Sequence, residues 1–145
     1  MASIFSGKML IKKDGKLYPA DEALRDKQLI CLYFAAHWCP PCRMFTPVLA
    51  NVYKVAKGDN LAIEVIFISA DRNKNDMLNY MKTSHGDWYG LPFDDPLQGE
   101  VEERFKVVGV PTLLVMKADG TMVCANGKKV VQERGVQAFR DWLGN

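Results

Sequence analysis

Residues 28–56 read QLICLYFAAHWCPPCRMFTPVLANVYKVA. The first part, up to Ala36, is almost wholly apolar, which is typical of a central strand covered on both faces. From Met44 onwards apolar residues recur at helical spacing. Pro40 and Pro41 stand at the start of this pattern, where a helix tolerates proline best. The stretch therefore predicts a buried strand that leads directly into a helix.

Two cysteines, Cys39 and Cys42, lie at the junction of this strand and this helix. Their spacing places them one helical turn apart on the same face, so their sulfur atoms can form a disulfide with little backbone movement. The N-terminus of a helix presents free N–H groups and the positive end of the helix dipole, and both favour a thiolate. The arrangement predicts a site of thiol–disulfide exchange.

The rest of the chain alternates between helical and strand patterns. We expect a hairpin around Asp14-Gly15, a strand over 62–69, a helix over 73–81, an irregular stretch over 83–99, a helical turn over 100–105, a strand over 112–117 paired across Asp119-Gly120 with 121–125, and an amphipathic helix over 133–143. This alternation predicts an α/β fold with a mixed central sheet flanked by helices on both faces, in a single domain over residues 1–145.

Composition narrows the classes of function. The formal net charge is only +2, and the basic residues are dispersed, so we expect no binding to nucleic acid or to a membrane surface. No apolar run is long enough for a membrane helix, and residues 1–8 lack the pattern of a signal peptide. These features favour a reducing, cytosolic compartment. Cys31 and Cys124 lie inside apolar runs, which predicts that both are buried core residues.

Two segments resemble known active-site sequences. The stretch Tyr33–Pro47, YFAAHWCPPCRMFTP, resembles the active-site strand and helix of the thioredoxin superfamily. Phe105–Met116, FKVVGVPTLLVM, is similar to the segment of that family that carries its cis-proline. Ser69–Arg72, and Trp88 followed by Leu91–Phe93, are similar to the nucleoredoxins and tryparedoxins. The resemblance implies a thioredoxin-like fold.

The resemblance also implies roles for individual residues. Cys39, nearer the helix N-terminus and expected to be the more exposed, would attack a disulfide, and Cys42 would resolve the mixed disulfide that results. Pro111 would be the cis-proline beside the sulfur atoms. The backbone of Val110 would pair with an extended substrate segment. Trp38 would shield one side of the site.

Three further residues are expected to modulate the site, and a fourth, Tyr33, bears on which group accepts the proton of Cys42. Pro40 and Pro41 preset the first turn of the helix, and Arg43 either favours the thiolate as a nearby cation or is simply solvated. Tyr33 stands where bacterial-type thioredoxins carry a buried aspartate that accepts the proton of the resolving thiol. Because a tyrosine is a poor base at neutral pH, the proton acceptor for this thiol stays open.

The function implied is the reduction of disulfide bonds in protein substrates, with an external thiol or an NADPH-linked system as reductant. No organic cofactor and no metal is implied, and we expect a monomer in the cytoplasm, with the nucleus as a second location. The alternative is a redox-responsive binding or signalling regulator, for which residues 83–99 are the candidate partner surface. In that stretch, Trp88 and Tyr89 either line the substrate face or pack beneath a loop. A zinc site is disfavoured because only one close cysteine pair is visible.

Overall fold

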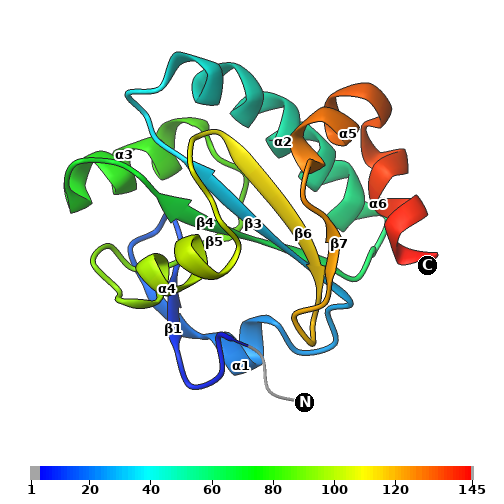
Figure 1. Cartoon of the computed structure of the whole chain (residues 1–145), viewed down its shortest axis with the longest axis horizontal. Coiled ribbons are helices and arrows are strands. Elements are labelled where there is room, and N and C mark those ends of the chain that lie inside the picture. Colours follow the sequence, from blue (N-terminus) through cyan, green and yellow to red (C-terminus); the bar gives the residue numbers. More distant parts are fainter. Residues whose placement is uncertain (1–3, 145) are drawn as a thin grey trace.

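The computed structural model describes residues 4–144 of the chain, and a seven-stranded mixed sheet forms its centre (Figure 1). The elements, in chain order, are β1 (Met9–Ile11), β2 (Leu17–Pro19), α1 (Ala20–Ala23), β3 (Leu29–Ala35), α2 (Pro40–Gly58), β4 (Ile63–Ser69), α3 (Lys74–Ser84), β5 (Tyr89–Gly90), α4 (Leu97–Arg104), β6 (Thr112–Lys117), β7 (Met122–Cys124), α5 (Gly127–Arg134) and α6 (Val136–Leu143).

The strand order is β2-β1-β5-β4-β3-β6-β7. The central pairs β3–β4 and β4–β5 are parallel, whereas β1 pairs antiparallel with β2 and β5, and β6 pairs antiparallel with β3 and β7. All seven residues of β3 and all seven of β4 are buried. The expected mixed sheet with buried central strands is therefore confirmed.

Helices cover both faces of this sheet (Figure 1). Successive residues of β3 point to opposite faces, so Cys31 and Tyr33 pack toward α2, α3, α5 and α6, whereas Ile30 and Leu32 pack toward α1 and α4. The expected core position of Cys31 is confirmed, because its exposed fraction is 0%. Cys124, at the end of the edge strand β7, packs against the core but is only half-buried, so the prediction of a buried residue is wrong there.

Two other expectations are corrected. The amphipathic segment expected over 133–143 is divided between two helices, α5 and α6, because Gly135 adopts φ 57° and ψ −138° and interrupts the helical backbone. Residues 83–99 include a strand, β5, of only two residues, and α4 begins at Leu97 rather than at residue 100. Across residues 4–144, no helix combines the length and apolar character that a bilayer-crossing segment requires.

Candidate active site

Cys39 is the N-cap residue of α2, directly beyond the carboxyl end of β3. Its backbone is extended, and its sulfur accepts a hydrogen bond from the backbone N–H of Cys42 at 3.3 Å. An N-cap side chain normally accepts a hydrogen bond from a free amide of the first turn, and here the sulfur fills that place. The position supplies an amide donor that stabilises negative charge on Cys39 Sγ.

Both cysteines are free thiols, and both are nearly enclosed. Cys39 is 4% exposed and Cys42 is 0% exposed, so Cys39 is the more accessible of the two, although by a small margin. Burial, and after it the hydrogen bond to Cys39, raises the pKa of the Cys42 thiol to about 12. Cys42 is therefore a protonated thiol at neutral pH.

A segment more than seventy residues further along the chain completes the site. The Val110–Pro111 peptide bond is cis, and Pro111 directly precedes β6, which pairs antiparallel with β3. The carbonyl oxygen of Val110 accepts a hydrogen bond from Cys39 Sγ at 3.8 Å. The structure thus contains the expected cis peptide bond, and the carbonyl oxygen of the residue before the proline contacts the sulfur.

The loop that carries Trp38 is fastened to the turn after β4. The indole Nε1–H of Trp38, a half-exposed residue, donates to the carbonyl oxygen of Ala70 at 2.9 Å. The backbone N–H of His37 donates to Asp71 Oδ1 at 2.8 Å, and the hydroxyl of Ser69 donates to Asp71 Oδ2 at 2.7 Å. Asp71 is a buried carboxylate that the sequence offered, beside Asn73, only as a cap for the next helix, and the structure gives that cap to Asn73. Its place just beyond the carboxyl end of a central strand is a signal for a site residue.

The other expected residues lie in the first turn of α2. Pro40 and Pro41 are its first two residues and are exposed. Arg43 is also exposed, and its backbone N–H donates to the carbonyl oxygen of Cys39 at 3.1 Å. Its guanidinium forms no hydrogen bond or ion pair within residues 4–144, so the structure brings its backbone, but not its charged group, into contact with Cys39.

A hydrogen-bonded hub lies behind Cys42. The hydroxyl of Thr46 donates to the carbonyl oxygen of Cys42 at 2.9 Å. When Thr46 gives its one proton to this carbonyl, its Oγ1 accepts from the phenol groups of Tyr33 at 2.7 Å and Tyr80 at 2.6 Å. The Tyr33 hydroxyl also lies 3.5 Å from the Cys42 carbonyl oxygen. Burial raises the pKa of Tyr33 and also that of Tyr80, to about 12 for the latter, so neither phenol is a base at neutral pH. Tyr33 therefore has a structural role in this hub.

His85 fills an aromatic enclosure next to this hub. Its Nδ1 accepts a hydrogen bond from Trp88 Nε1 at 3.1 Å, which places the ring proton on Nε2. Nε2 has no hydrogen-bond partner among the described residues, and the rings of Phe67 and Tyr80 stand edge-on to the imidazole at centroid distances of 4.4 and 4.3 Å. Burial lowers the pKa of His85 to about 3, so the side chain is neutral at physiological pH.

Trp88 and Tyr89 lie away from the face that carries Cys39. Trp88 is 0% exposed and packs edge-to-face on Tyr53, so it is a core residue rather than a substrate contact. Tyr89 lines a cavity near the opposite end of α2. Within residues 4–144, no group of three or more His, Cys, Asp or Glu side chains is placed to hold a metal ion.

Comparison with known proteins agrees with this geometry. A family model described as thioredoxin-like matches residues 26–122. The chain is 43% identical over 110 residues to probable nucleoredoxin 1 of Arabidopsis thaliana, covering 76% of this chain and 19% of the relative. Among solved structures, thioredoxin-related protein 16 of Carcinoscorpius rotundicauda is 44% identical with a TM-score of 0.84 and covers 98% of this chain and 99% of that one. Tryparedoxin from Trypanosoma brucei is 35% identical with a TM-score of 0.79, covering 94% and 92%.

The chain belongs to the thioredoxin-like family. Within the thioredoxin superfamily it is a nucleoredoxin- and tryparedoxin-like protein, as the matches to both groups show. The chain spans only 19–27% of the length of the curated plant nucleoredoxins from Arabidopsis thaliana and rice that it matches at 43% and 35% identity.

Proposed function

We propose that the protein reduces disulfide bonds in protein substrates through the dithiol of Cys39 and Cys42. The observation that supports this most directly is the hydrogen bond from the Cys42 amide to Cys39 Sγ at the start of α2. A thiolate held there attacks one sulfur of the substrate disulfide, forms a mixed disulfide with it, and releases the other substrate sulfur as a thiolate.

The second step requires Cys42 to lose its proton. The hydrogen bond to Cys39 and the charge of Cys39 both contribute to the raised pKa of Cys42. Once Cys39 Sγ is part of a mixed disulfide it carries no charge, so these two contributions are removed and the pKa of Cys42 falls. The Cys42 thiolate then attacks Cys39 Sγ, releases the reduced substrate and leaves a Cys39–Cys42 disulfide, and its proton passes to water or to the departing substrate thiolate.

The neighbouring residues would position the substrate and tune the site. Trp38 precedes Cys39 in the chain and would shield one side of the site, and the Val110 carbonyl oxygen contacts Cys39 Sγ next to the cis bond to Pro111. An extended substrate segment would lie against the backbone of Val110. Pro40 and Pro41 would hold the first turn of α2 in place. Arg43 is exposed beside this turn and would act through its charge alone.

The remaining parts of the proposal concern the setting of the reaction. An external thiol or an NADPH-linked system would reduce the Cys39–Cys42 disulfide and restore the dithiol. We propose that residues 1–145 work as one domain and as a monomer, in the cytoplasm and also in the nucleus. Two core clusters that share one continuous sheet support the assignment of one domain.

The experiment that tests the mechanism is a trapping assay with matched serine variants. Cys42→Ser should accumulate a mixed disulfide between Cys39 and a disulfide-bonded substrate such as insulin, detected by intact mass. Cys39→Ser should form no such adduct and should show no turnover. Turnover that persists in Cys39→Ser, or an adduct on Cys42 in place of Cys39, would contradict the assigned roles.

A second candidate function is a redox-responsive regulator that binds a partner protein. The Carcinoscorpius rotundicauda relative is described as having a role in regulating the activity of the transcription factor NF-kB, which favours this candidate. The two candidates differ in what a variant without both active-site thiols does. If Cys39→Ser, Cys42→Ser retains partner binding while it loses disulfide reduction, the regulator is favoured, whereas loss of both favours the reductase.

A further inference from the structure

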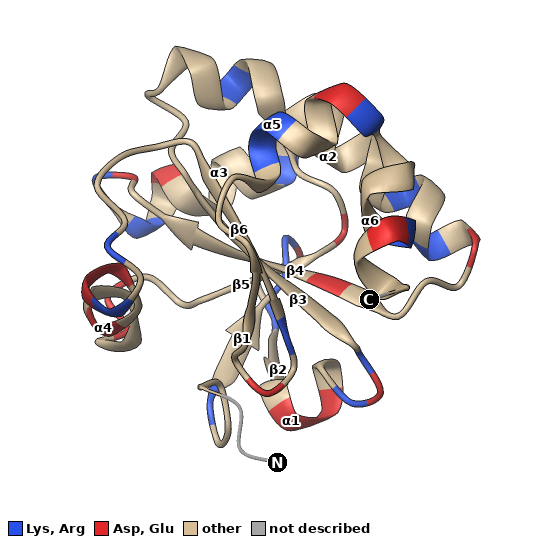
Figure 2. Cartoon of the chain, turned by 45° about the vertical axis from the view of Figure 1, so that its right-hand side comes forward, with Lys and Arg blue, Asp and Glu red and all other residues tan. Residues whose placement is uncertain are grey.

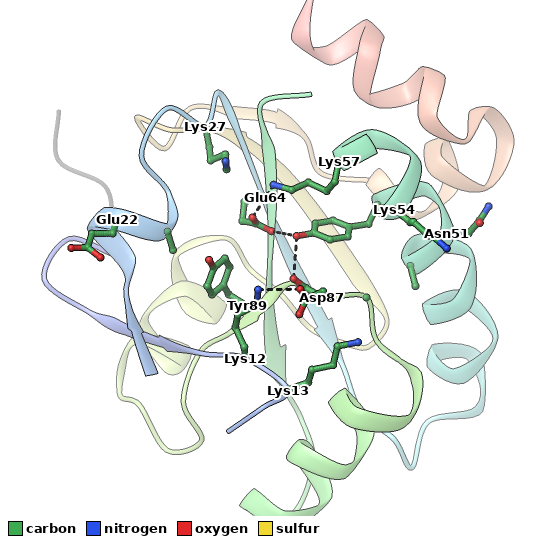
Figure 3. Close-up of a pocket in the computed structure, with 14 residues that line it drawn as sticks. Lys12, Lys13, Glu22, Lys27, Asn51, Lys54, Lys57, Glu64, Asp87 and Tyr89 are labelled. Carbon is green, nitrogen blue, oxygen red and sulfur yellow. Dashed lines mark hydrogen bonds and ion pairs between the residues drawn. The ribbon is translucent and has the colours of Figure 1, made fainter. Parts of the chain in front are cut away.

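A cavity of about 760 Å³ opens on the side of the sheet where β5 is too short to continue. The ladder between β4 and β5 includes only Ile66 and Phe67 of β4, so within residues 4–144 the first part of β4 has no strand partner on this edge. The cavity occupies this gap between the end of β1, β4 and the second half of α2, and residues of α1 also line it (Figure 3). Its size is that of a small-molecule site.

The inner wall of the cavity is a hydrogen-bonded group around Glu64. Glu64 is 3% exposed and is the only charged residue in β3 or β4, where Figure 2 shows a single acidic segment. Tyr53 donates to its Oε1 at 2.7 Å, and the ammonium of Lys57 lies 3.2 Å from its Oε2. The negative charge of this carboxylate is therefore already neutralised within the protein.

The second acidic group is neutralised in the same way. Asp87 stands opposite Glu64 across the tyrosine hydroxyl, and the ammonium of Lys12 lies 3.2 Å from its Oδ2 (Figure 3). The third carboxylate of the lining, Glu22 of α1, is exposed. The acidic residues thus leave little free negative charge inside the cavity.

Three further lysines line the cavity without a carboxylate partner. Lys13, Lys27 and Lys54 come from three separate segments and line the cavity at different points of its wall (Figure 3). Within residues 4–144 none of them has an ion-pair partner, and the ammonium of Lys13 binds only the carbonyl oxygen of His85. The five lysines and three acids of the lining carry the whole formal excess of +2 of the chain, so the remaining Lys and Arg residues are balanced by the remaining acids.

The cavity also has an apolar wall. The ring of the half-buried Tyr89 lines it together with Ala23 and Ala50. The ammonium of Lys12 lies over the Tyr89 ring, 5.0 Å from its centroid, so a cation and an aromatic surface stand side by side. A ligand that suits this lining combines anionic groups with a flat or apolar part.

We propose that this cavity binds a small organic phosphate that carries a ring, of the kind represented by a nucleoside diphosphate. Lysine ammonium groups bind phosphate oxygens as point charges, and a concave site of this volume suits a small molecule better than the flat face of a protein. Lys54 lies twelve residues beyond Cys42 on the same helix, about 18 Å along its axis, so the ligand does not contact the dithiol.

Binding should be measured on the full chain by calorimetric titration with ADP, with inorganic pyrophosphate, and with adenosine as the compound that lacks phosphate. We expect saturable binding of ADP and none of adenosine, with backbone NMR shifts concentrated at Lys54, Gly86 and Tyr89 and absent at Cys39. The double variant Lys27→Gln, Lys54→Gln should weaken ADP binding at least tenfold, because each lysine lost removes a charged contact to phosphate.

The matched control is Lys82→Gln, Lys129→Gln, which removes the same charge from two exposed lysines outside the cavity. Its affinity for ADP should stay within twofold of the parent chain. Equal weakening in both double variants would reveal general electrostatic attraction and overturn the site. Failure of both ADP and pyrophosphate to bind would also overturn it. Binding of an oligoglutamate peptide, but of neither phosphate, would assign the cavity to an acidic protein partner instead.

Discussion

The hydroxyl of Thr46 links three buried groups behind Cys42. It donates to the Cys42 carbonyl oxygen and accepts from two buried phenols, so all of its hydrogen-bonding capacity is used. In the sequence this threonine stands between Phe45 and Pro47, and no spacing rule predicts that the phenol groups of Tyr33 and Tyr80 both meet its hydroxyl. Such a hub depends on the packing of α2 against both β3 and α3, which a linear pattern does not contain.

Replacing Thr46 should therefore cost more than removing either of its partners. Thr46→Val removes the nearest hydrogen-bond partner of two buried phenol O–H groups and should lower the free energy of unfolding by about 3 kcal/mol. Tyr33→Phe removes one donor and leaves the rest of the hub intact, so it should cost about 1 kcal/mol. Urea unfolding of both variants measures the difference. Equal costs would show that the hub does not act as described.

His85 should make the stability of the fold sensitive to acid. Its pKa is lowered to about 3 in the folded protein by burial, below its ordinary value of 6.5, so the unfolded chain binds the proton more tightly. Its contribution is fully present above pH 6.5 and is lost as the pH falls toward 3. The stability advantage of the parent chain over His85→Phe should shrink by about 2 kcal/mol between pH 7 and pH 5.

The measurement is urea unfolding of both proteins at the two pH values. Carboxylates titrate in both chains, and their effect cancels in the difference between them. An unchanged difference between pH 7 and pH 5 would show that the imidazole is already accessible to protons in the folded protein.

At the scale of elements, the sequence predicts best what is buried on both faces. The central strands were predicted because a short, continuous apolar run is typical of a strand that is covered on both faces. The start of α2 was predicted because adjacent prolines fit the first turn of a helix. The two-residue strand β5 has no periodicity to detect. The tie between His37 and Asp71 spans 34 positions, so only the folded sheet brings these residues together.

The division of the C-terminal helices was missed for a definite reason. An isolated glycine inside a helical pattern is tolerated, and the residues around Gly135 do not predict its φ of 57°. The amphipathic pattern of Val136 to Leu143 is real, since the buried side chains of α6 lie on one face, but the helix begins only after this glycine.

Gly135→Ala should destabilise the protein by about 1–3 kcal/mol, because an L-residue is strained at this backbone conformation. No atom lies within 4 Å of the added Cβ, so the cost is conformational and not steric. The control is Gly58→Ala at the last position of α2, which also meets open space but has no positive φ. That variant should be neutral or slightly stabilising in thermal unfolding. Equal behaviour of the two would contradict the assigned strain.

At the scale of the whole molecule, the two ends of α2 serve different purposes. The N-terminal end carries the dithiol, and the C-terminal half lines the basic cavity. The composition correctly indicated a modest net charge, yet a total of +2 does not show that the excess of lysines over acidic residues lies around one cavity. Charge distribution is a property of the fold, because the lysines concerned are as much as 45 positions apart along the chain.

The joint between the N-terminal hairpin and the rest of the sheet has a consequence for local unfolding. In the backbone ladder, the hairpin of β1 and β2 is attached to the sheet through a single residue pair, Ile11 with Gly90. Its side chains add the ion pairs Lys8–Asp95 and Lys12–Asp87, a hydrogen bond from Lys13 to the His85 carbonyl oxygen, and the buried residues Leu10 and Ile11. A unit held by so few backbone bonds should open by itself, at a lower free energy than global unfolding.

Amide hydrogen exchange should therefore show two classes of protection. The amides of β1 and β2 should exchange earlier than those of β3 and β4, and added salt should accelerate them further by screening the two ion pairs. Uniform exchange across all four strands would instead show one cooperative unit. The same motion would widen the gap beside β5, so the hairpin would act as the hinged wall through which a ligand enters and leaves the cavity.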